Sequence, residues 1–215
     1  MVFTPVTDNN RFPIWEVSEI EIPEKFETLF NNPDFYKCSW RSYTNAASYR
    51  SRKLKQPPGR SKFVCERTSI HKLLKPVTSQ VVKFVKTQQD YNLNHTWPPF
   101  YIDSIDEVNE TMGVEVIQDM GGYDMGAHLD NNLMVFTFIF NLIDNPRAGT
   151  EYYTDETASR VLYKANPKKG YGVLHVNTPY LWHNGVNRTK RVRQAVMCNY
   201  GVNFVDKSTP VSNVI

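Results

Sequence analysis

The sequence predicts an α+β fold in which helices come first and a larger β-rich region follows. A long helix is predicted over residues 70–85, where apolar side chains recur with the i, i+3, i+4, i+7 spacing of a helix face. From about residue 98, short strand-like runs alternate with turns rich in glycine and proline. Many short strands at such spacing are typical of a sandwich or barrel, so we expect the helix to pack on one sheet.

The segments before residue 98 are expected to support that β-rich region. Residues 14–22 have a strand-like mix of apolar and polar positions, and Pro23 suits the start of a short helix over 24–31. Thr68 or Ser69 is placed to cap the long helix, and Pro76 predicts a kink inside it or a split into two pieces. The basic stretch 50–62 contains a Pro-Pro-Gly breaker and is interpreted as an exposed loop, with a substrate lid or a phosphate-contacting arm as the alternative.

The β-rich region is expected to form the core of a single domain. A chain of 215 residues is compatible with one domain over 1–215, with support from about 1–97 and the core from about 98–205. Strands are predicted at 99–103, 113–119, 133–142, 150–153, 160–164, 171–176 and 191–200. The turns that separate several of them are expected at 121–122, 145–149 and 166–170.

Composition excludes few functions, but the cysteine content favours a cytoplasmic protein. The net charge of +3 is too small to imply a nucleic-acid or membrane partner by itself. Cys38, Cys65 and Cys198 are odd in number and widely spaced, which suggests neither a disulfide framework nor a zinc site. We therefore expect reduced cysteines and a cytoplasmic location. The N-terminal residues do not resemble a signal peptide, and no apolar stretch reaches the ~18 residues of a membrane span.

The most informative feature is the triplet His128-Leu129-Asp130, followed far downstream by His183 and Arg193. On a strand, residues i and i+2 point the same way, so His128 and Asp130 can face one metal ion. Two imidazoles and one carboxylate are the ligands of a facial non-haem Fe(II) site. The triplet alone is common by chance, and the alternative is a turn histidine beside a solvated aspartate.

Further motifs occur in a fixed order around these residues. A glycine-punctuated loop at 118–127 leads into the triplet, and the continuous apolar run 134–142 follows it. Next come Gly149-Thr150-Glu151-Tyr152, Pro167-Lys168-Lys169-Gly170-Tyr171-Gly172, His183-Asn184-Gly185-Val186 and Arg193. Taken together, residues from about 116 to 200 resemble the 2-oxoglutarate/Fe(II)-dependent dioxygenases, and most closely their prolyl-hydroxylase-like branch.

The resemblance implies a double-stranded β-helix core, of the jelly-roll or cupin-like type, in a hydroxylase. His128, Asp130 and His183 would bind Fe(II), and Arg193 would pair with the C5 carboxylate of the co-substrate 2-oxoglutarate. With O2, the reaction would yield succinate, CO2 and an oxidised substrate. Further co-substrate contacts are expected from Thr137, Asn141, Ala195 and Gln118. Asn141 departs from the family, because many members have a tyrosine there that donates to the C5 carboxylate.

Several residues near the motif have a structural and a functional interpretation. Tyr123, Tyr152, Arg188 and Arg191 are candidate substrate contacts, although aromatic residues are often core and the arginines could belong to a solvated hairpin end. His175 could compete with His183 as the distal ligand, but a packed or hydrogen-bonded histidine is favoured.

The substrate class is the main question that the sequence leaves open. The leading hypothesis is hydroxylation of an amino acid, a peptide or another small molecule. A nucleic-acid dioxygenase of the AlkB-like type would share the iron site, and the basic stretch 50–62 is its support. A non-catalytic cupin-like binding module would need neither the three metal ligands nor the arginine. Oligomeric state is not indicated.

Overall fold

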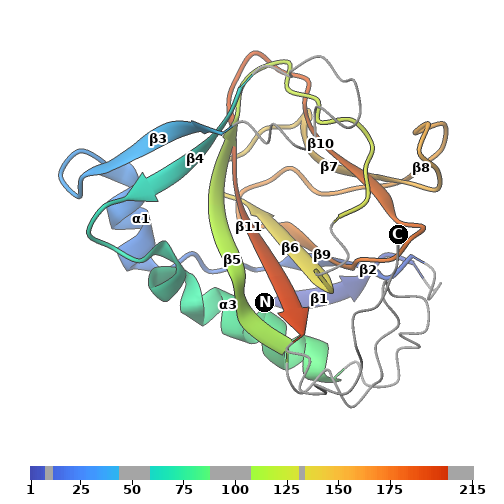
Figure 1. Ribbon diagram of the computed structural model, residues 1–215, viewed down its shortest axis with the longest axis horizontal. Helices are drawn as coiled ribbons and strands as arrows, with labels where there is room; N and C mark the ends of the chain where they lie inside the picture. Colours follow the sequence, from blue (N-terminus) through green and yellow to red (C-terminus); the bar gives the residue numbers. More distant parts are fainter. Residues whose placement is uncertain (8–11, 44–58, 88–107, 131–133, 203–215) are drawn as a thin grey trace, which may run out of the picture.

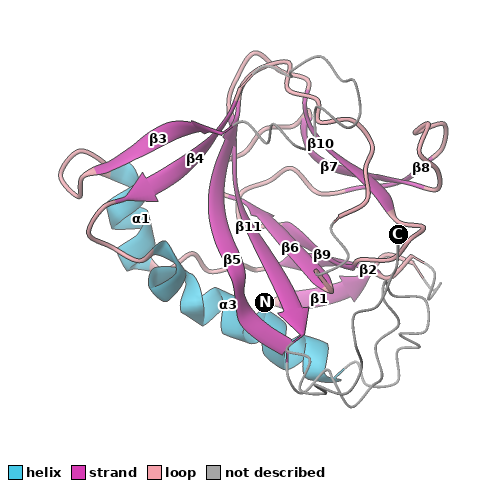
Figure 2. Ribbon diagram, viewed as in Figure 1, coloured by secondary structure: helices cyan, strands magenta, loops and turns pink. Residues whose placement is uncertain are grey.

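The computed structural model describes residues 1–7, 12–43, 59–87, 108–130 and 134–202. Within them, two antiparallel sheets form most of the fold (Figures 1 and 2). The large sheet has the order β1-β2-β9-β6-β11-β5-β4-β3, and the small sheet has the order β10-β7-β8. The large sheet comprises β1 (Val2–Pro5), β2 (Ile14–Ser18), β3 (Cys38–Tyr43), β4 (Arg60–Cys65), β5 (Val108–Asp119), β6 (Phe136–Asn141), β9 (Gly172–Val176) and β11 (Arg193–Val202). The small sheet comprises β7 (Ala148–Tyr153), β8 (Val161–Lys164) and β10 (Trp182–Asn187).

Helices α1 (Glu24–Asn31) and α3 (Ile70–Thr87) lie where the sequence predicts them. Ser69 is the residue that caps α3, since its hydroxyl oxygen accepts the Lys72 backbone N–H at 3.4 Å. Pro76 lies inside α3, and the helix is continuous across it rather than split in two. Among the residues that the structure describes, no helix has both the length and the apolar character needed to span a membrane.

One apolar cluster joins the helices to the large sheet. Leu74, Val77 and Val81 of α3 belong to it together with the sheet residues Phe138 and Val196. The neighbours of those sheet residues along each strand point to the opposite face, as the pleat of a strand requires. Because Phe138 and Val196 face the helices, the residues next to them on β6 and β11 face the small sheet.

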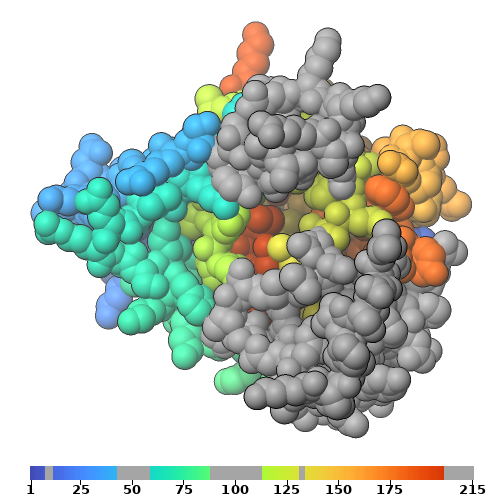
Figure 3. Space-filling view, viewed as in Figure 1, coloured from blue at the N-terminus to red at the C-terminus, as the bar shows by residue number. Residues whose placement is uncertain are grey.

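A second apolar cluster occupies the space between the two sheets. Ile117, Ile139 and Ala195 of the large sheet meet Tyr152 of the small sheet there, and Met197 packs against them. Side chains along 193–197 therefore alternate as in a regular strand, with Ala195 and Met197 on the inner face and Val196 on the helix side. In the space-filling view, part of β11 (red) is visible beside the yellow-green residues of β5 (Figure 3).

Some strands were not predicted, because their sequences lack the usual strand pattern. β1, β3, β4 and β10 are of this kind, and β10 (WHNGVN) has apolar side chains only at Trp182 and Val186. β10 forms because it pairs along its whole length with β7. The interpretation of 50–62 as a loop is wrong for residues 60–62, which begin β4, whereas residues 50–58 and the strand expected at 99–103 lie outside the described residues.

The expectation that the cysteines form no disulfide is also wrong. Cys38 and Cys65 are joined, and Cys198 is free and buried. The two joined residues lie directly opposite each other in the β3–β4 pair. Their separation of 27 residues gives no hint of this pairing, because the sequence does not reveal the register of two unpredicted strands.

Removal of the disulfide should measurably destabilise the protein. A cross-link that closes a loop of this length restricts the unfolded chain and contributes roughly 3 kcal/mol to the free energy of unfolding. We expect the Cys38→Ser/Cys65→Ser variant to show a loss of that size in urea unfolding followed by circular dichroism. The matched control is Cys198→Ser. Equal unfolding midpoints for the oxidised protein and the double variant would show that the link contributes nothing.

Candidate metal centre

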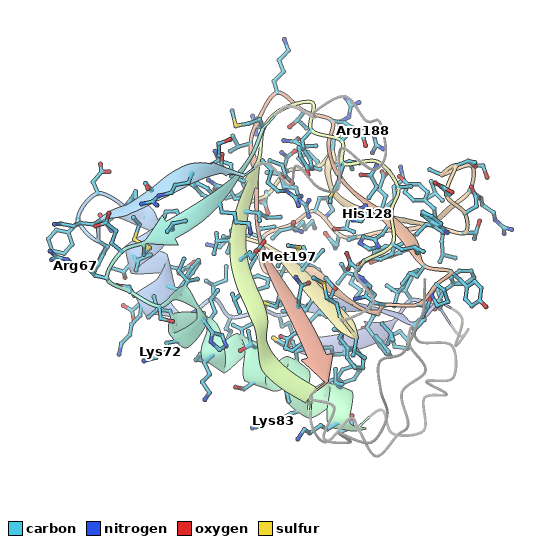
Figure 4. The ribbon with its side chains drawn as sticks, viewed as in Figure 1. Arg67, Lys72, Lys83, His128, Arg188 and Met197 are labelled. Atoms are coloured by element: carbon cyan, nitrogen blue, oxygen red, sulfur yellow. A yellow bond between two sulfur atoms is a disulfide. The ribbon has the colours of Figure 1, made fainter. Side chains whose placement is uncertain are left out.

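His128, Asp130 and His183 lie together between the two sheets. His128 forms an isolated antiparallel bridge with His183, and their backbone N–H and C=O groups exchange hydrogen bonds of 2.9 and 3.0 Å. Asp130 follows two residues after His128. One potential ligand atom from each of the three side chains lies within 4.8 Å of the others. Figure 4 shows His128 near β10, the strand that carries His183.

The orientation of both imidazoles suits metal binding. Nδ1 of His128 lies 2.9 Å from the Gly126 carbonyl oxygen, and Nδ1 of His183 lies 3.4 Å from that of Leu181. A proton on each Nδ1 donates to these carbonyls, and the Nε2 lone pairs then face Asp130. Such backbone bonds fix the tautomer of histidine ligands in known metal sites.

The Asp130 carboxylate is held with one oxygen toward the imidazoles. Its Oδ1 lies 3.9 Å from Nε2 of His128 and 3.4 Å from Nε2 of His183. Its Oδ2 accepts a hydrogen bond of 2.9 Å from the Thr137 hydroxyl. Burial raises the pKa of Asp130, but His183, His175 and His128 outweigh that effect and hold the pKa well below its usual range. The carboxylate is therefore ionised and oriented for binding through Oδ1.

His175 lies next to this group as a neighbour of Asp130. Its Nε2 is 3.7 Å from Asp130 Oδ2, and its Nδ1 shares a hydrogen bond of 2.8 Å with the Tyr152 hydroxyl. The side chain is fully buried, and burial lowers the pKa of His175. Its contacts are those of the packed, hydrogen-bonded histidine favoured by the sequence.

The three side chains fit Fe(II). Two imidazole nitrogens and one carboxylate oxygen are ligands that Fe(II) accepts, and the group contains no thiolate of the kind that marks structural zinc sites. A metal ion held by these three residues would keep coordination positions for a small organic acid and oxygen. The geometry therefore supports a catalytic rather than a structural metal.

Arg193 is buried on the inner face of β11, at 3% exposure. Its Nη1 lies 3.1 Å from Asp119 Oδ2, and its Nη2 donates to the Thr150 hydroxyl at 3.3 Å. Its Nε is buried and has no hydrogen-bond partner among the described residues. Burial lowers the pKa of Arg193 and Arg60 acts in the same direction, whereas Asp119 opposes both.

Asp119 is a site residue that the sequence did not reveal. It lies on β5 directly opposite Arg193 on β11 and directly opposite Arg60 on β4, so that the three side chains form a row across the sheet. Nε of Arg60 donates to Asp119 Oδ1 at 2.6 Å, and Nη2 donates to Oδ2 at 3.1 Å. The Arg60 guanidinium also lies 4.7 Å from the centre of the Tyr123 ring. We call Arg60, Asp119 and Arg193 the Arg–Asp–Arg cluster.

The remaining candidate co-substrate residues fall into different places. Thr137 contacts Asp130, and Ala195 belongs to the apolar cluster between the sheets. The Asn141 amide donates to the backbone carbonyl of Asn166 at 2.9 Å. Gln118 lies on the face of β5 opposite to Asp119, where it accepts a hydrogen bond from Gln194 at 2.9 Å.

The candidate substrate residues also separate. Tyr123 and Tyr152 are buried on the inner side, near Arg60 and His175 respectively. Arg188 directly follows the end of β10 and binds the Glu151 carboxylate through both terminal nitrogens. That pairing lowers the pKa of Glu151 to about 2. Arg191 is exposed. The structure therefore does not bring the two arginines to the metal ligands.

Comparisons with known proteins give matches to solved structures only. No protein-family model and no curated protein matches this chain. A prolyl hydroxylase from Trichoplax adhaerens, solved with a peptide of hypoxia-inducible factor, is 15% identical, with a TM-score of 0.59 over 90% of this chain and 84% of that one. A viral collagen prolyl hydroxylase from Paramecium bursaria Chlorella virus-1, solved with 2-oxoglutarate, is 12% identical, with a TM-score of 0.50 over 87% and 94% of the two chains.

A third similar structure has a different activity. The epimerase SnoN, solved with Fe3+, α-ketoglutarate and nogalamycin RO, is 10% identical, with a TM-score of 0.54 over 89% of this chain and 79% of that one. Similarity at such low identity concerns the fold. The jelly-roll-like arrangement of mostly antiparallel strands with two helices, among the described residues, is the arrangement that these proteins share with this chain. The chain therefore has the fold that these two prolyl hydroxylases and this epimerase share, which is the fold expected from the resemblance to the 2-oxoglutarate/Fe(II)-dependent dioxygenases.

Proposed function

We propose that the protein is a non-haem Fe(II) dioxygenase that couples oxidative decarboxylation of 2-oxoglutarate to hydroxylation of an amino acid, a peptide or another small molecule. The observation that carries this proposal is the convergence of His128, Asp130 and His183 within 4.8 Å in a chain with this fold. The buried, incompletely bonded Arg193 on the same inner face adds a partner for an organic acid. One domain over residues 1–215 carries the site in this proposal.

The side chains have distinct tasks. Fe(II), when bound, supplies the coordination of the keto acid and the activation of O2. His128 and His183 offer Nε2 atoms whose orientation is fixed through Nδ1, and Thr137 holds the second oxygen of Asp130. Arg193 would hold the distal C5 carboxylate, which a planar guanidinium binds through two parallel N–H groups.

The apolar residues between the sheets would keep this reaction away from water. Ile117, Ile139 and Leu181 are each less than a tenth exposed and line the space around Ala195 and Tyr152. A small residue at 195 leaves room beside the keto acid. In a site closed to water, the charge of Arg193 acts on its ligand more strongly than it would in solvent.

The substrate is proposed only as a class. The Trichoplax prolyl hydroxylase was solved with a peptide, which shows that this fold can accept one. Action on a nucleic acid had its support in the basic stretch 50–62, of which residues 50–58 lie outside the described part and Arg60 is buried. We therefore favour an amino acid, a peptide or another small molecule.

A succinate assay tests the proposed function and the substrate class together. Purified protein with Fe(II), 2-oxoglutarate and O2 should release succinate, and the correct substrate class should raise that release above the uncoupled background. Pools of amino acids, peptides and oligonucleotides serve as separate arms. Stimulation by oligonucleotides alone would favour the nucleic-acid alternative, and the absence of succinate in every arm would contradict the proposal.

The cytoplasmic location remains a prediction from the sequence. Disulfides are rare in cytosolic proteins, so the link between Cys38 and Cys65 removes the observation on which that prediction was based. Alkylation of free thiols in freshly lysed cells, followed by mass spectrometry, measures whether the two residues are joined where the protein is made.

A further inference from the structure

The Arg–Asp–Arg cluster contains two buried cations that share one carboxylate. Arg60 is 9%, Asp119 0% and Arg193 3% exposed. In the part of the chain that the structure describes, the ion pair of Arg193 is the one with Asp119. Buried charges that lack full compensation are costly, so their retention calls for a physical reason.

Arg60 takes the larger share of the Asp119 carboxylate. It donates to both oxygens, at 2.6 and 3.1 Å, in the fork geometry of a strong guanidinium–carboxylate pair. Arg193 has one contact with the same carboxylate, at 3.1 Å to Oδ2. Nε of Arg193 is buried and has no hydrogen-bond partner within the described part of the chain. Arg193 therefore keeps both charge and a donor group for a further anion.

The two guanidinium groups meet at a place where the small sheet carries no side chain. A β-carbon added to Gly185 would lie 3.2 Å from Nη2 of Arg60 and 3.4 Å from Nη1 of Arg193. Gly185 is two residues from His183 on β10, so both residues are on the inner face of that strand. Both guanidinium groups thus lie on the side of the sheet that carries the metal ligands.

We propose that Arg60 is a positioning residue for the co-substrate: it neutralises Asp119 and so leaves the charge of Arg193 available for the distal carboxylate of 2-oxoglutarate. This inference rests on the proposed function and assigns a task to Arg60 and Asp119 within the same site. Arg60 comes from β4, far from the dioxygenase-like motifs at 116–200 in the sequence.

The charges explain why Arg60 is needed. The three groups together have one net positive charge, which a single carboxylate neutralises. Without Arg60, Asp119 would turn both oxygens to Arg193, and its negative charge would repel the incoming carboxylate. Asp119 in turn separates two like charges in a buried site, so the cluster can exist before the co-substrate binds.

Two variants that change the net charge of the cluster and a double variant that restores it test the role of Arg60. The variants are Arg60→Gln, Asp119→Asn and the double variant, with Arg41→Gln as a matched control on the neighbouring strand β3. Arg41 is 61% exposed and lies 3.9 Å from Glu66. Calorimetry under anaerobic conditions measures the Kd of 2-oxoglutarate for the Mn(II)-loaded proteins. A separate titration measures the Kd of Mn(II), and circular dichroism checks the fold.

We expect Arg60→Gln to weaken 2-oxoglutarate binding by roughly 10- to 100-fold without a matching change for Mn(II). Asp119→Asn should bind 2-oxoglutarate at least as tightly as the wild type. The double variant has the same net charge as the native cluster and should recover to within a few fold of the wild type. Arg41→Gln should not differ from the wild type.

Three results would overturn the inference. They are unchanged binding in Arg60→Gln, a double variant no better than Arg60→Gln, and an Asp119→Asn variant that loses affinity. A double variant that binds no better than Arg60→Gln would mean that Arg60 only joins β4 to β5. Should Arg60→Gln fail to fold, Arg60→Lys, which keeps the charge, must bind within a few fold of the wild type. A wild-type protein that binds Mn(II) but not 2-oxoglutarate would instead contradict the proposed function itself.

Discussion

Asp130→Ala should abolish turnover and lower the affinity for Fe(II) or Mn(II) by more than about 100-fold, the upper range for the loss of a residue that only supports a ligand. The reason is that the substitution removes the anionic ligand of the three and leaves two neutral imidazoles. Among the described residues, Asp130 is the only carboxylate in the group, and its Oδ1 lies 3.4 Å from Nε2 of His183. Calorimetry with Mn(II) measures the loss.

A graded series distinguishes a ligand from a packing residue. Asp130→Glu should also bind metal poorly, because the added methylene moves the carboxylate away from the position that Thr137 fixes. Thr137→Val keeps the ligand and removes its hydrogen bond, and should therefore cost roughly 10- to 100-fold in metal affinity. Circular dichroism should show a native fold in every case. Metal binding by Asp130→Ala at wild-type affinity would rule out the assignment.

Arg193→Gln should mainly weaken the binding of 2-oxoglutarate. The expected loss of binding free energy is roughly 1.5–3 kcal/mol, as for a charge-assisted hydrogen bond. That loss corresponds to roughly a 10- to 150-fold higher Kd. The substitution removes the guanidinium whose Nε has no partner in the described ranges, while Asp119 keeps its pair with Arg60. Calorimetry of 2-oxoglutarate binding to the Mn(II)-loaded variant measures the effect, and Mn(II) binding should be preserved.

Arg193→Lys separates charge from shape. Lysine keeps the positive charge but has a point-like ammonium, which cannot bind a carboxylate through two parallel N–H groups. We expect an affinity between those of the wild type and Arg193→Gln. If Arg193→Gln retains wild-type affinity for the co-substrate, the carboxylate is held elsewhere in the protein.

The parts of this site that the sequence predicts are those set by local periodicity and by motif order. The spacing of apolar residues predicts α3, and strand alternation places Ala195 and Met197 on the inner face. Motif order leads to the three candidate metal ligands, which the fold then brings within 4.8 Å. The expectation that His128 and Asp130 lie on a strand is wrong, because His128 forms only an isolated bridge with His183 and Asp130 lies outside the strands, yet both side chains reach the same site.

The parts that the sequence does not predict depend on strand register. Gln118 was expected near the co-substrate, but its neighbour Asp119 has the inward position, because a shift of one residue exchanges the two faces of a strand. Arg60 lies in a basic, proline-containing stretch that favours a solvated loop. Only the pairing of β4 with β5 places it opposite Asp119. The register of β3 and β4 likewise determines the disulfide.

An anaerobic absorption titration of the wild-type protein shows whether Fe(II) and 2-oxoglutarate bind together at this site. We expect a metal-to-keto-acid charge-transfer band that needs both Fe(II) and 2-oxoglutarate. The band should be absent in Asp130→Ala, and in Arg193→Gln it should require a higher concentration of 2-oxoglutarate. A folded wild-type protein that shows no band at saturating Fe(II) and 2-oxoglutarate would contradict the account.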